Sequence, residues 1–534
     1  MGKSYRSGAD PAVVEFRGEY YMFVTRSWGY WHSKDLLNWD FITPEKWYFE
    51  GCNAPAAHNY KDSILYVCGN PSGAMSILYT DNPKRGDWKA VPSVLHDLQD
   101  PALFIDDDER AYMYWGSSNR WPIRGKELDM KNKFLPIAKK PDSLLFLRPD
   151  IHGWERFGEN HTSDIKPFIE GAWMTKHNGK YYLQYAAPGT QFNVYGDGVY
   201  VGKSPLGPFQ YAAHNPFCYK PGGFATGAGH GSTVCGPGGI YWHFGTIHLS
   251  INYKFERRLC MFPTFFDEDG VMYSDTYFGD YPHYSPDQVS RQTTSGGFRG
   301  WMLLSYGKPV KASSQLESYP VENVTDENLK TFWVAGKNDD KQWVEIDLEE
   351  VSDVYALQLN FFDYEETGFW GRMPNLRQRY LVEASVDGAR WRVLVDYRNS
   401  FRDAPHNYIE LDQPIEARYI RYRHHYVPGK NLAMGNIRVF GLGRGKKPAT
   451  VKGFTVVREA DERNVRISWK AVKGAQGYNV LWGVAPDKLY SSWMVYGDNS
   501  LDLRALTVGQ KYYFAIEAFN ENGISQRVFL REAH

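Results

Sequence analysis

Three carboxylates stand at the head of segments with the same layout, and a pair of carboxylates can act as general acid and general base. Asp10 and Asp100 each precede a proline, an apolar run, a polar turn and an aromatic-rich run. Glu170 precedes a Gly-Ala-Trp turn and a hairpin pattern. If Phe168 and Trp173 pack against this carboxyl group, its lost hydration raises its pKa, as a general acid near neutral pH requires. We expect the three carboxylates to converge on one axis.

The segments that position these carboxylates form five cycles across residues 1–290. The cycles open near Asp10, Asn53, Asp100, Glu170 and His230, and each contains short runs of Tyr, Trp, Phe and Val separated by Gly, Asn or Asp turns. Repeats of about 40 to 60 residues with four short strands are typical of a β-propeller. The pattern predicts five blades, with four as the alternative, and treats residues 123–160 and 191–198 as surface excursions.

The same region resembles glycoside hydrolase family 43, whose members are inverting enzymes on a five-bladed propeller. The motifs that carry the resemblance are Ala9-Asp10-Pro11, Ser33 to Trp39, Gln99 to Ala102, Ile169 to Ala172 and Gly229 to Ser232. The resemblance implies that Asp10 is the general base, that Glu170 is the general acid, and that Asp100 tunes the pKa of the acid and orients it. It also implies that His230 lies near the axis, in some members beside a bound calcium. A turn or cap role is the alternative for the aspartates, because Asp before Pro favours turns.

Aromatic and basic residues near these motifs are candidates for contacts with a sugar. They are Trp28, Trp115, Trp173, His230 and Arg26, with Arg6 and His58 as further candidates for binding hydroxyl groups. Aromatic rings stack on sugars but also pack between blades, so both interpretations stay open. His230 is in addition the candidate metal ligand of this region.

Residues 301–443 contain many short segments with period-two alternation, which predicts an antiparallel sandwich. This region resembles the discoidin fold, also called coagulation factor 5/8 type C, through Asn323 to Trp333 and Ala417 to Arg421. Such folds often hold a structural calcium, for which Asp326 is the candidate. Phe369, Trp370 and Arg372 lie in an insertion that we interpret as a sugar-binding or domain-docking loop.

Residues 449–534 follow a basic linker and predict a small immunoglobulin-like sandwich. The region resembles a fibronectin type III domain, and Leu506 to Tyr512 has the spacing of a tyrosine corner. We expect it to act as a spacer or a brace between domains.

The composition limits the kinds of partner that we expect for this protein. With 61 basic and 62 acidic residues the net charge is −1, which gives no reason to expect nucleic acid or an anionic membrane as partner. Five cysteines without a Cys-x-x-Cys spacing argue against a disulfide framework or a zinc site, although one pair could bond. No apolar run reaches the roughly 18 residues of a membrane span. No signal peptide precedes the first repeat, yet we expect an exported protein, periplasmic, cell-surface or secreted, because polymer-degrading enzymes of this build usually are. The oligomeric state is left open.

The sequence therefore predicts an all-β protein: a five-bladed β-propeller followed by a discoidin-like β-sandwich and an immunoglobulin-like β-sandwich. The expected activity is inverting hydrolysis that removes terminal or side-chain sugars from a complex, plant-type polysaccharide or oligosaccharide. No cofactor is required for this chemistry. An α-L-arabinofuranosidase or β-xylosidase is favoured, with a galactose-directed enzyme, either a galactofuranosidase or an exo-galactanase, as the alternative. A non-catalytic glycan-binding protein is the alternative from another class; a lost carboxylate would support it, and none of the three is missing.

Overall fold

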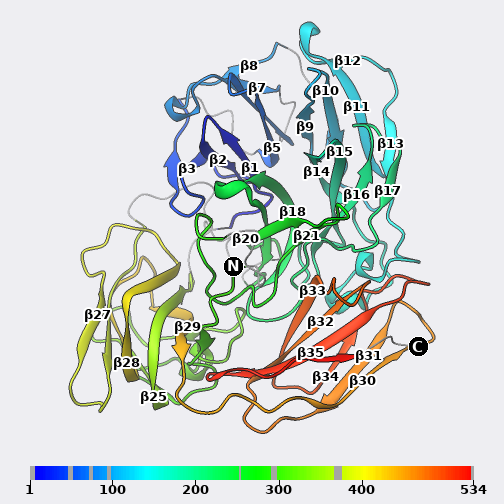
Figure 1. Cartoon of the computed structure of the whole chain (residues 1–534). Helices are drawn as coiled ribbons and strands as arrows, with labels where there is room; N and C mark the ends of the chain where they lie inside the picture. Colours follow the sequence, from blue (N-terminus) through cyan, green and yellow to red (C-terminus); the bar gives the residue numbers. More distant parts are fainter. Residues whose placement is uncertain are drawn as a thin grey trace.

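The computed structural model describes residues 7–45, 52–70, 76–92, 98–251, 254–289, 297–365 and 376–530. Their regular elements are β-strands and short 3-10 helices, with no α-helix in these ranges. Figure 1 shows one large body above two smaller ones. Arg6, Phe369, Trp370 and Arg372, named above as candidates, lie outside the described residues.

The large body consists of five antiparallel sheets in which nearly every strand pairs with the next strand in the sequence. The first sheet contains β1 (Ala12–Phe16), β2 (Glu19–Phe23), β3 (Tyr30–Ser33) and β4 (Asp40–Ile42), and the second contains β5 (Asn53–Tyr60), β6 (Ile64–Asn70), β7 (Leu78–Thr80) and β8 (Lys89–Ala90). The third contains β9 (Ala102–Ile105), β10 (Ala111–Trp115), β11 (Ile123–Asp129), β12 (Leu135–Pro136) and β13 (Asp142–Leu145). The fourth contains β14 (Glu170–His177), β15 (Lys180–Ala187), β16 (Gly196–Gly202) and β17 (Phe209–Tyr211), and the fifth contains β18 (Thr226–Cys235), β19 (Tyr241–His248), β20 (Arg257–Phe266) and β21 (Met272–Ser274). The prediction of five blades, rather than four, is confirmed.

The inner strand of each blade contacts the inner strands of its neighbours, and β1 contacts β18 to close the ring. At this closure the Ser232 hydroxyl donates to the carbonyl oxygen of Pro11 over 2.7 Å and accepts the N–H of Val13 over 2.8 Å. Because the five inner strands start around one axis, the residues at their starts lie close together although they are far apart in the sequence.

Two segments predicted as surface excursions are parts of the propeller. Within residues 123–160, β11, β12 and β13 supply the outer strands of the third blade. Within residues 191–198, Val194, Tyr195 and Asp197 are buried and β16 begins. The prediction was wrong because wide spacing between motifs indicated insertions, whereas the third blade carries an additional strand and the second segment turns back toward the axis.

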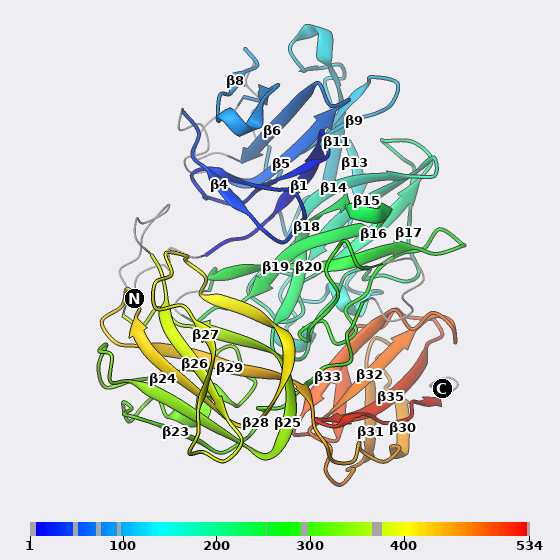
Figure 2. The ribbon, with the colours of Figure 1, turned by 60° about the vertical axis from the view of Figure 1, so that its left-hand side comes forward.

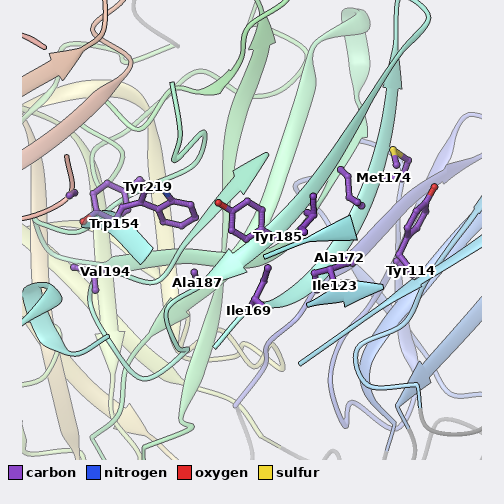
Figure 3. Packing of buried hydrophobic residues seen from close by; sticks show 14 of the residues in the cluster. Tyr114, Ile123, Trp154, Ile169, Ala172, Met174, Tyr185, Ala187, Val194 and Tyr219 are labelled. Atoms are coloured by element: carbon purple, nitrogen blue, oxygen red, sulfur yellow. The ribbon is translucent and has the colours of Figure 1, made fainter. Parts of the chain in front are cut away.

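The main apolar core runs from the third and fourth blades into the third body. Figure 3 shows it passing from Tyr114 through Tyr185 to Trp154 and Tyr219. The Tyr219 ring lies 6.3 Å from that of Trp482, which belongs to the third body. Burial of this continuous surface stabilises the contact between the two bodies as well as each body itself.

The second body, a β-sandwich, is built on two long strands, β25 (Trp343–Phe361) and β28 (His406–Tyr426), which pair with each other and carry register shifts. The remaining strands are β22 (Met302–Leu303), β23 (Val310–Ala312), β24 (Trp333–Val334), β26 (Arg379–Ser385), β27 (Arg392–Asp396) and β29 (Ala433–Leu442). Their inward residues enclose a separate apolar core. Alternation of buried and partly buried residues along much of β25 follows the predicted period of two.

The third body consists of two sheets. One has the order β30-β31-β34 and the other the order β33-β32-β35-β36, with β37 also paired to β35. The strands are β30 (Lys452–Arg458), β31 (Val465–Lys470), β32 (Gly477–Gly483), β33 (Ser491–Tyr496), β34 (Ser500–Leu503), β35 (Tyr513–Asn520), β36 (Gly523–Ile524) and β37 (Val528–Leu530). The predicted tyrosine corner is confirmed, because the Tyr512 hydroxyl accepts the N–H of Thr507 over 3.1 Å.

Figure 2 shows both smaller bodies next to the propeller, and side-chain contacts join them to it. Arg438 of β29 forms a buried ion pair with Glu327 at 2.7 Å and donates to the carbonyl oxygen of Asp280 in the propeller. Tyr273 of β21 stacks on Tyr490 of the third body with ring centroids 3.7 Å apart. The five cysteines are all free. Within the described ranges no helix is long and apolar enough to cross a membrane.

Candidate active site

Four residues that the motifs single out meet at the starts of inner strands. Asp10 precedes β1, Asp100 precedes β9, Glu170 opens β14 and His230 lies in β18. Nδ1 of His230 lies 3.4 Å from Oδ1 of Asp10 and 3.8 Å from Oδ2 of Asp100. The fields of Asp10, Asp100 and Glu170 all act on this imidazole. The structure therefore gathers the three carboxylates around one histidine.

The backbone at these positions is held in an uncommon conformation. Asp10, Asp100 and His230 have φ values of 56°, 48° and 49°, in the left-handed region that few non-glycine residues occupy. Gly171 follows Glu170 with φ of 63°, and a Cβ at this position would stand 2.8 Å from the His230 ring. Glycine is therefore required here, because a side chain would displace the histidine. Clusters of such backbone conformations are typical of functional sites.

Asp10 is surrounded by groups that favour its ionised form. The Thr25 hydroxyl donates to Oδ2 over 2.5 Å, and Nη1 of Arg257 lies 3.4 Å from Oδ1. Burial raises the pKa of Asp10, but Arg257, His230 and Thr25 together outweigh burial and place the pKa below its ordinary value. Asp10 is therefore a carboxylate at neutral pH, the state in which it can accept a proton.

Glu170 is held by two hydroxyl groups. Tyr195 donates to Oε1 over 2.6 Å, and Ser117 donates to Oε2 over 3.0 Å. A β-bulge between Glu170 and Trp173 changes the register of β14 at this point. Of the two aromatic residues expected beside this carboxyl group, Phe168 is 37% exposed and Trp173 packs, partly buried, against the cores of several blades.

Among the three carboxyl groups of the site, Asp100 is the one whose pKa is raised. Burial raises it first, Glu170 and Asp10 add repulsion, and His230 and Ser117 oppose them, so that the pKa of Asp100 rises to about 7. Burial lowers the pKa of His230, but the surrounding carboxylates outweigh burial and raise it above its ordinary value. Near neutral pH the cluster thus contains a proton shared among groups that titrate together.

Asp197 fixes the backbone around His230. This carboxylate is fully buried and accepts the N–H groups of His230 over 2.7 Å and of Gly231 over 3.0 Å. Its other contact is Nε2 of His243 at 3.1 Å. Asp197 therefore sets the orientation of His230 without belonging to any motif of the sequence.

Several residues of the site could not be identified from the sequence. They are Thr25, Ser117, Tyr195, Asp197 and Arg257. Tyr195 and Asp197 come from the segment 191–198 that was predicted to lie on the surface. The number of residues between Glu170 and this segment could have revealed its position. Antiparallel strands that pair return the chain to the same end of the blade, and this return brings the segment back towards Glu170.

The candidate sugar contacts have different surroundings. Trp115 is 8% exposed and belongs to the main core, so the structure favours packing between blades over contact with a sugar. Trp28 is partly buried in the loop after β2, and Arg26 donates from Nε to Oδ1 of Asn53 over 2.7 Å, bridging the first two blades.

The interpretation of His58 as a hydroxyl-binding residue was also wrong. Its Nε2 accepts the N–H of Ile105 over 3.2 Å, and its ring packs edge-on against Phe104. Burial lowers the pKa of His58 to about 4. The side chain therefore joins the second and third blades as a neutral imidazole.

The metal predictions can be compared with the side chains present. Across the described ranges no group of three or more His, Cys, Asp or Glu side chains is arranged to hold a metal ion. The Asp326 carboxylate accepts from the Thr331 hydroxyl, the N–H of Asn328 and the side-chain amide of Asn436. Neither His230 nor Asp326 is part of such a group.

Comparisons with known proteins agree with this geometry. Residues 5–272 match Glycosyl hydrolases family 43, and residues 309–434 match the F5/8 type C domain. A β-xylosidase of Xylanibacter ruminicola is 33% identical over 133 residues, which are 21% of this chain and 39% of the relative. An arabinoxylan arabinofuranohydrolase of Bacillus subtilis is 30% identical over 189 residues, 31% of this chain and 34% of the relative. A β-D-galactofuranosidase of Aspergillus niger is 25% identical over 301 residues, 49% of this chain and 80% of the relative. The chain thus spans less than half the length of the first two relatives.

Proposed function

The chain belongs to glycosyl hydrolase family 43, whose members hydrolyse glycosidic bonds with inversion, and from this premise we propose that it removes terminal or side-chain sugars from a complex polysaccharide. The favoured activity is that of an α-L-arabinofuranosidase or a β-xylosidase, the activities that the names of two relatives carry. The observation that supports the proposal most strongly is the meeting of Asp10, Asp100 and Glu170 around His230.

In this proposal Asp10 is the general base. Inversion requires a carboxylate that takes a proton from water while the water attacks the anomeric carbon. Asp10 has the required ionised form, because Arg257, His230 and Thr25 lower its pKa. Its hydrogen bond from Thr25 and its contact with Arg257 hold the carboxylate in one orientation.

Glu170 is the general acid that protonates the leaving oxygen. An inverting pair needs about 6.5 to 9.5 Å between its carboxyl groups, which leaves room for sugar and water. Tyr195 and Ser117 orient the Glu170 carboxyl group through one oxygen each. Asp100, with its raised pKa, holds a proton beside Glu170 and so limits the negative charge of the cluster. We assign to it the tuning of the acid and to His230 the alignment of Asp100 and Asp10.

A galactose-directed hydrolase is the second candidate. It is favoured by one observation: the galactofuranosidase from Aspergillus niger matches this chain over 80% of its own length. The alternative of a non-catalytic glycan-binding protein requires a defective site, and the three carboxylates are all present.

The test of the proposed function is a panel of 4-nitrophenyl glycosides: α-L-arabinofuranoside, β-D-xyloside, β-D-galactofuranoside and β-D-galactoside. The intact protein is measured beside Asp10→Asn, which keeps the size of the side chain but cannot act as a base. Release of one sugar by the intact protein and its loss in the variant support the proposal. Equal activity of the two proteins would contradict the role of Asp10.

The accessory domains carry further proposals. The second body is an F5/8 type C domain. We assign the third to the fibronectin type III fold, because it pairs a three-stranded sheet with a larger one and contains the tyrosine corner of Tyr512. Structural calcium at Asp326 stays a prediction, for which a fall in melting temperature on adding a chelator is the test. Export from the cell also stays a proposal, tested by locating the protein in cell fractions of its source.

A further inference from the structure

A cavity is lined by residues of the propeller and of both smaller bodies. Figures 1 and 2 show how the three bodies lie beside one another. The volume of the cavity is about 640 Å³, within the range of small-ligand sites. The propeller contributes Asn193, Thr226 and His248, the second body contributes Lys330, and the third contributes Trp493 and Asp498. No single body forms this cavity, so it exists only in the complete chain.

Strand register connects the cavity with the carboxylate cluster. Thr226 of β18 is paired with His248 of β19, and His248 is paired with Arg257 of β20. Side chains of directly paired residues lie on the same face of a sheet, with Cβ atoms about 5 Å apart. The first two line the cavity, and the third contacts Asp10 at 3.4 Å. A single residue, Arg257, therefore separates the wall of the cavity from Asp10, the proposed general base.

The position of the cavity along β18, compared with that of the carboxylates, agrees with this connection. The N–H of Asp10 donates to the Thr246 hydroxyl, and Thr246 is paired with Gly229 in β18. Asp10 therefore lies beside Gly229 along the length of β18. Thr226 precedes Gly229, so it lies closer to the start of β18 than the carboxylates do. The cavity thus lies at the rim of the face on which Asp10 and Glu170 begin their strands.

Two buried polar atoms on this path lack a protein partner. They are Nδ1 of His248 and Nε of Arg257. His248 is 3% exposed, and burial lowers its pKa to about 4, so its imidazole is neutral near pH 7. A buried nitrogen without a partner is unfavourable, and a ligand can remove this cost by completing the hydrogen bond.

The lining favours a neutral, hydroxyl-rich ligand. Three acidic side chains, Glu159, Asp498 and Asp502, line the cavity together with two basic ones, Lys330 and Arg504, while Glu327 is neutralised by its ion pair with Arg438, so the cavity offers no excess of positive charge to a polyanion. Carboxylate and amide oxygens accept hydrogen bonds from hydroxyls, while the rings of Trp493 and Phe224 offer apolar faces. These are the groups that recognise sugars.

We propose that this junction cavity binds the part of a neutral oligosaccharide that extends beyond the sugar held at the carboxylates. The inference rests on the proposed hydrolase function and adds a site to it: the second and third bodies complete the substrate-binding surface. Substrate length then raises kcat/KM, because contacts in the cavity position the chain for the reaction at the axis.

The test uses the full chain and a substitution that fills the cavity. Thr226→Trp places a large ring beside His248, and the same substitution at the exposed Thr455 of β30 is the matched control. Substrates are a 4-nitrophenyl glycoside and xylo-oligosaccharides of two to six units, plain and with arabinofuranosyl side groups. We expect Thr226→Trp to keep activity on the aryl glycoside and to lose about tenfold in kcat/KM on the longest chains, equivalent to about 1.4 kcal/mol. Thr455→Trp should match the intact protein on both.

Two results would overturn the proposal: equal kcat/KM for short and long substrates in the intact protein, or full retention of the length effect in Thr226→Trp. If Thr226→Trp does not fold, Lys330→Ala replaces it, since Lys330 is 43% exposed at the rim and its truncation should weaken long substrates selectively. If the intact protein hydrolyses nothing, the hydrolase proposal fails separately. Calorimetry with the six-unit oligosaccharide then decides: binding that Thr226→Trp abolishes supports the cavity, and no binding refutes it.

Discussion

Replacing Asp100 by asparagine should make the protein more stable at alkaline pH while reducing its activity. Burial and the neighbouring Glu170 and Asp10 raise the pKa of Asp100 from 3.8 to about 7. Below about pH 4 the carboxyl group is protonated in both folded and unfolded chains and has no effect. Between pH 4 and 7 the unfolded chain loses this proton and the folded chain keeps it, so stability falls as pH rises. Above pH 7 the raised pKa of Asp100 lowers the free energy of unfolding by its full amount.

The magnitude follows from the same values. Each pKa unit corresponds to about 1.4 kcal/mol, so raising the pKa from 3.8 to about 7 lowers the free energy of unfolding by up to about 4 kcal/mol at pH 8. The amide side chain of Asp100→Asn carries no charge at any pH and avoids this cost. In a propeller of this size, 1 kcal/mol moves the melting temperature by about 2 to 4 °C. The variant should therefore melt up to about 8 to 16 °C above the intact protein at pH 8 and within a few degrees of it at pH 4.5.

The assay is a series of thermal melts from pH 4.5 to 8.5, with Asp10→Asn as the matched control. The pKa of Asp10 is lowered, so its ionised form contributes stability above pH 3.8 that is lost as pH falls through the lower folded pKa. Asp10→Asn should therefore be less stable than the intact protein at pH 8, the opposite of Asp100→Asn. A difference between Asp100→Asn and the intact protein that does not grow with pH would refute this reasoning.

Three further substitutions test other contacts. Arg438→Ala leaves Glu327 as a buried, unpaired charge and should destabilise the chain by about 3 to 5 kcal/mol, measured by urea denaturation with Glu327→Ala/Arg438→Ala as the control that removes both charges. Tyr512→Phe removes the hydrogen bond of the tyrosine corner and should cost about 1 kcal/mol in the melting of the third body. Asp197→Asn weakens the hydrogen bonds that orient His230, so kcat should fall about tenfold or more with KM little changed; an unaltered kcat would show that the orientation is set by other contacts.

Much of the architecture could be predicted because its signals are local. Asp-Pro at 10 and 100 and the Ile-Glu-Gly-Ala segment at 169 indicated which residues start the inner strands, and the structure brings them to one axis. Period-two alternation indicated the strands of the second body, and the spacing from Leu506 to Tyr512 indicated the tyrosine corner. The functional roles of the carboxylates as base, acid and tuning residue remain predictions.

The features that the sequence did not predict depend on contacts between segments that are distant in the sequence. Tyr195 reaches Glu170 and Arg257 reaches Asp10 only because of the register and bulges of β14 and β18, which no local pattern encodes. The raised pKa was expected at Glu170 from adjacent aromatic residues, whereas the value of about 7 belongs to Asp100, because burial beside two other carboxylates decides it. Trp115 was a candidate for sugar contact or for packing between blades, and it packs in the core; the sequence could not decide, because an aromatic residue on a blade strand suits both roles.

The central claim is that Glu170 donates the proton and Asp10 accepts one, and Glu170→Gln tests it most directly. The measurement is kcat/KM of this variant on glycosides of one sugar with leaving groups from nitrophenol to a second sugar. The account predicts near-normal rates with nitrophenol, which leaves without protonation, and losses of about 100-fold or more with sugar leaving groups. An equal loss for every leaving group would contradict the assignment of Glu170 as the acid.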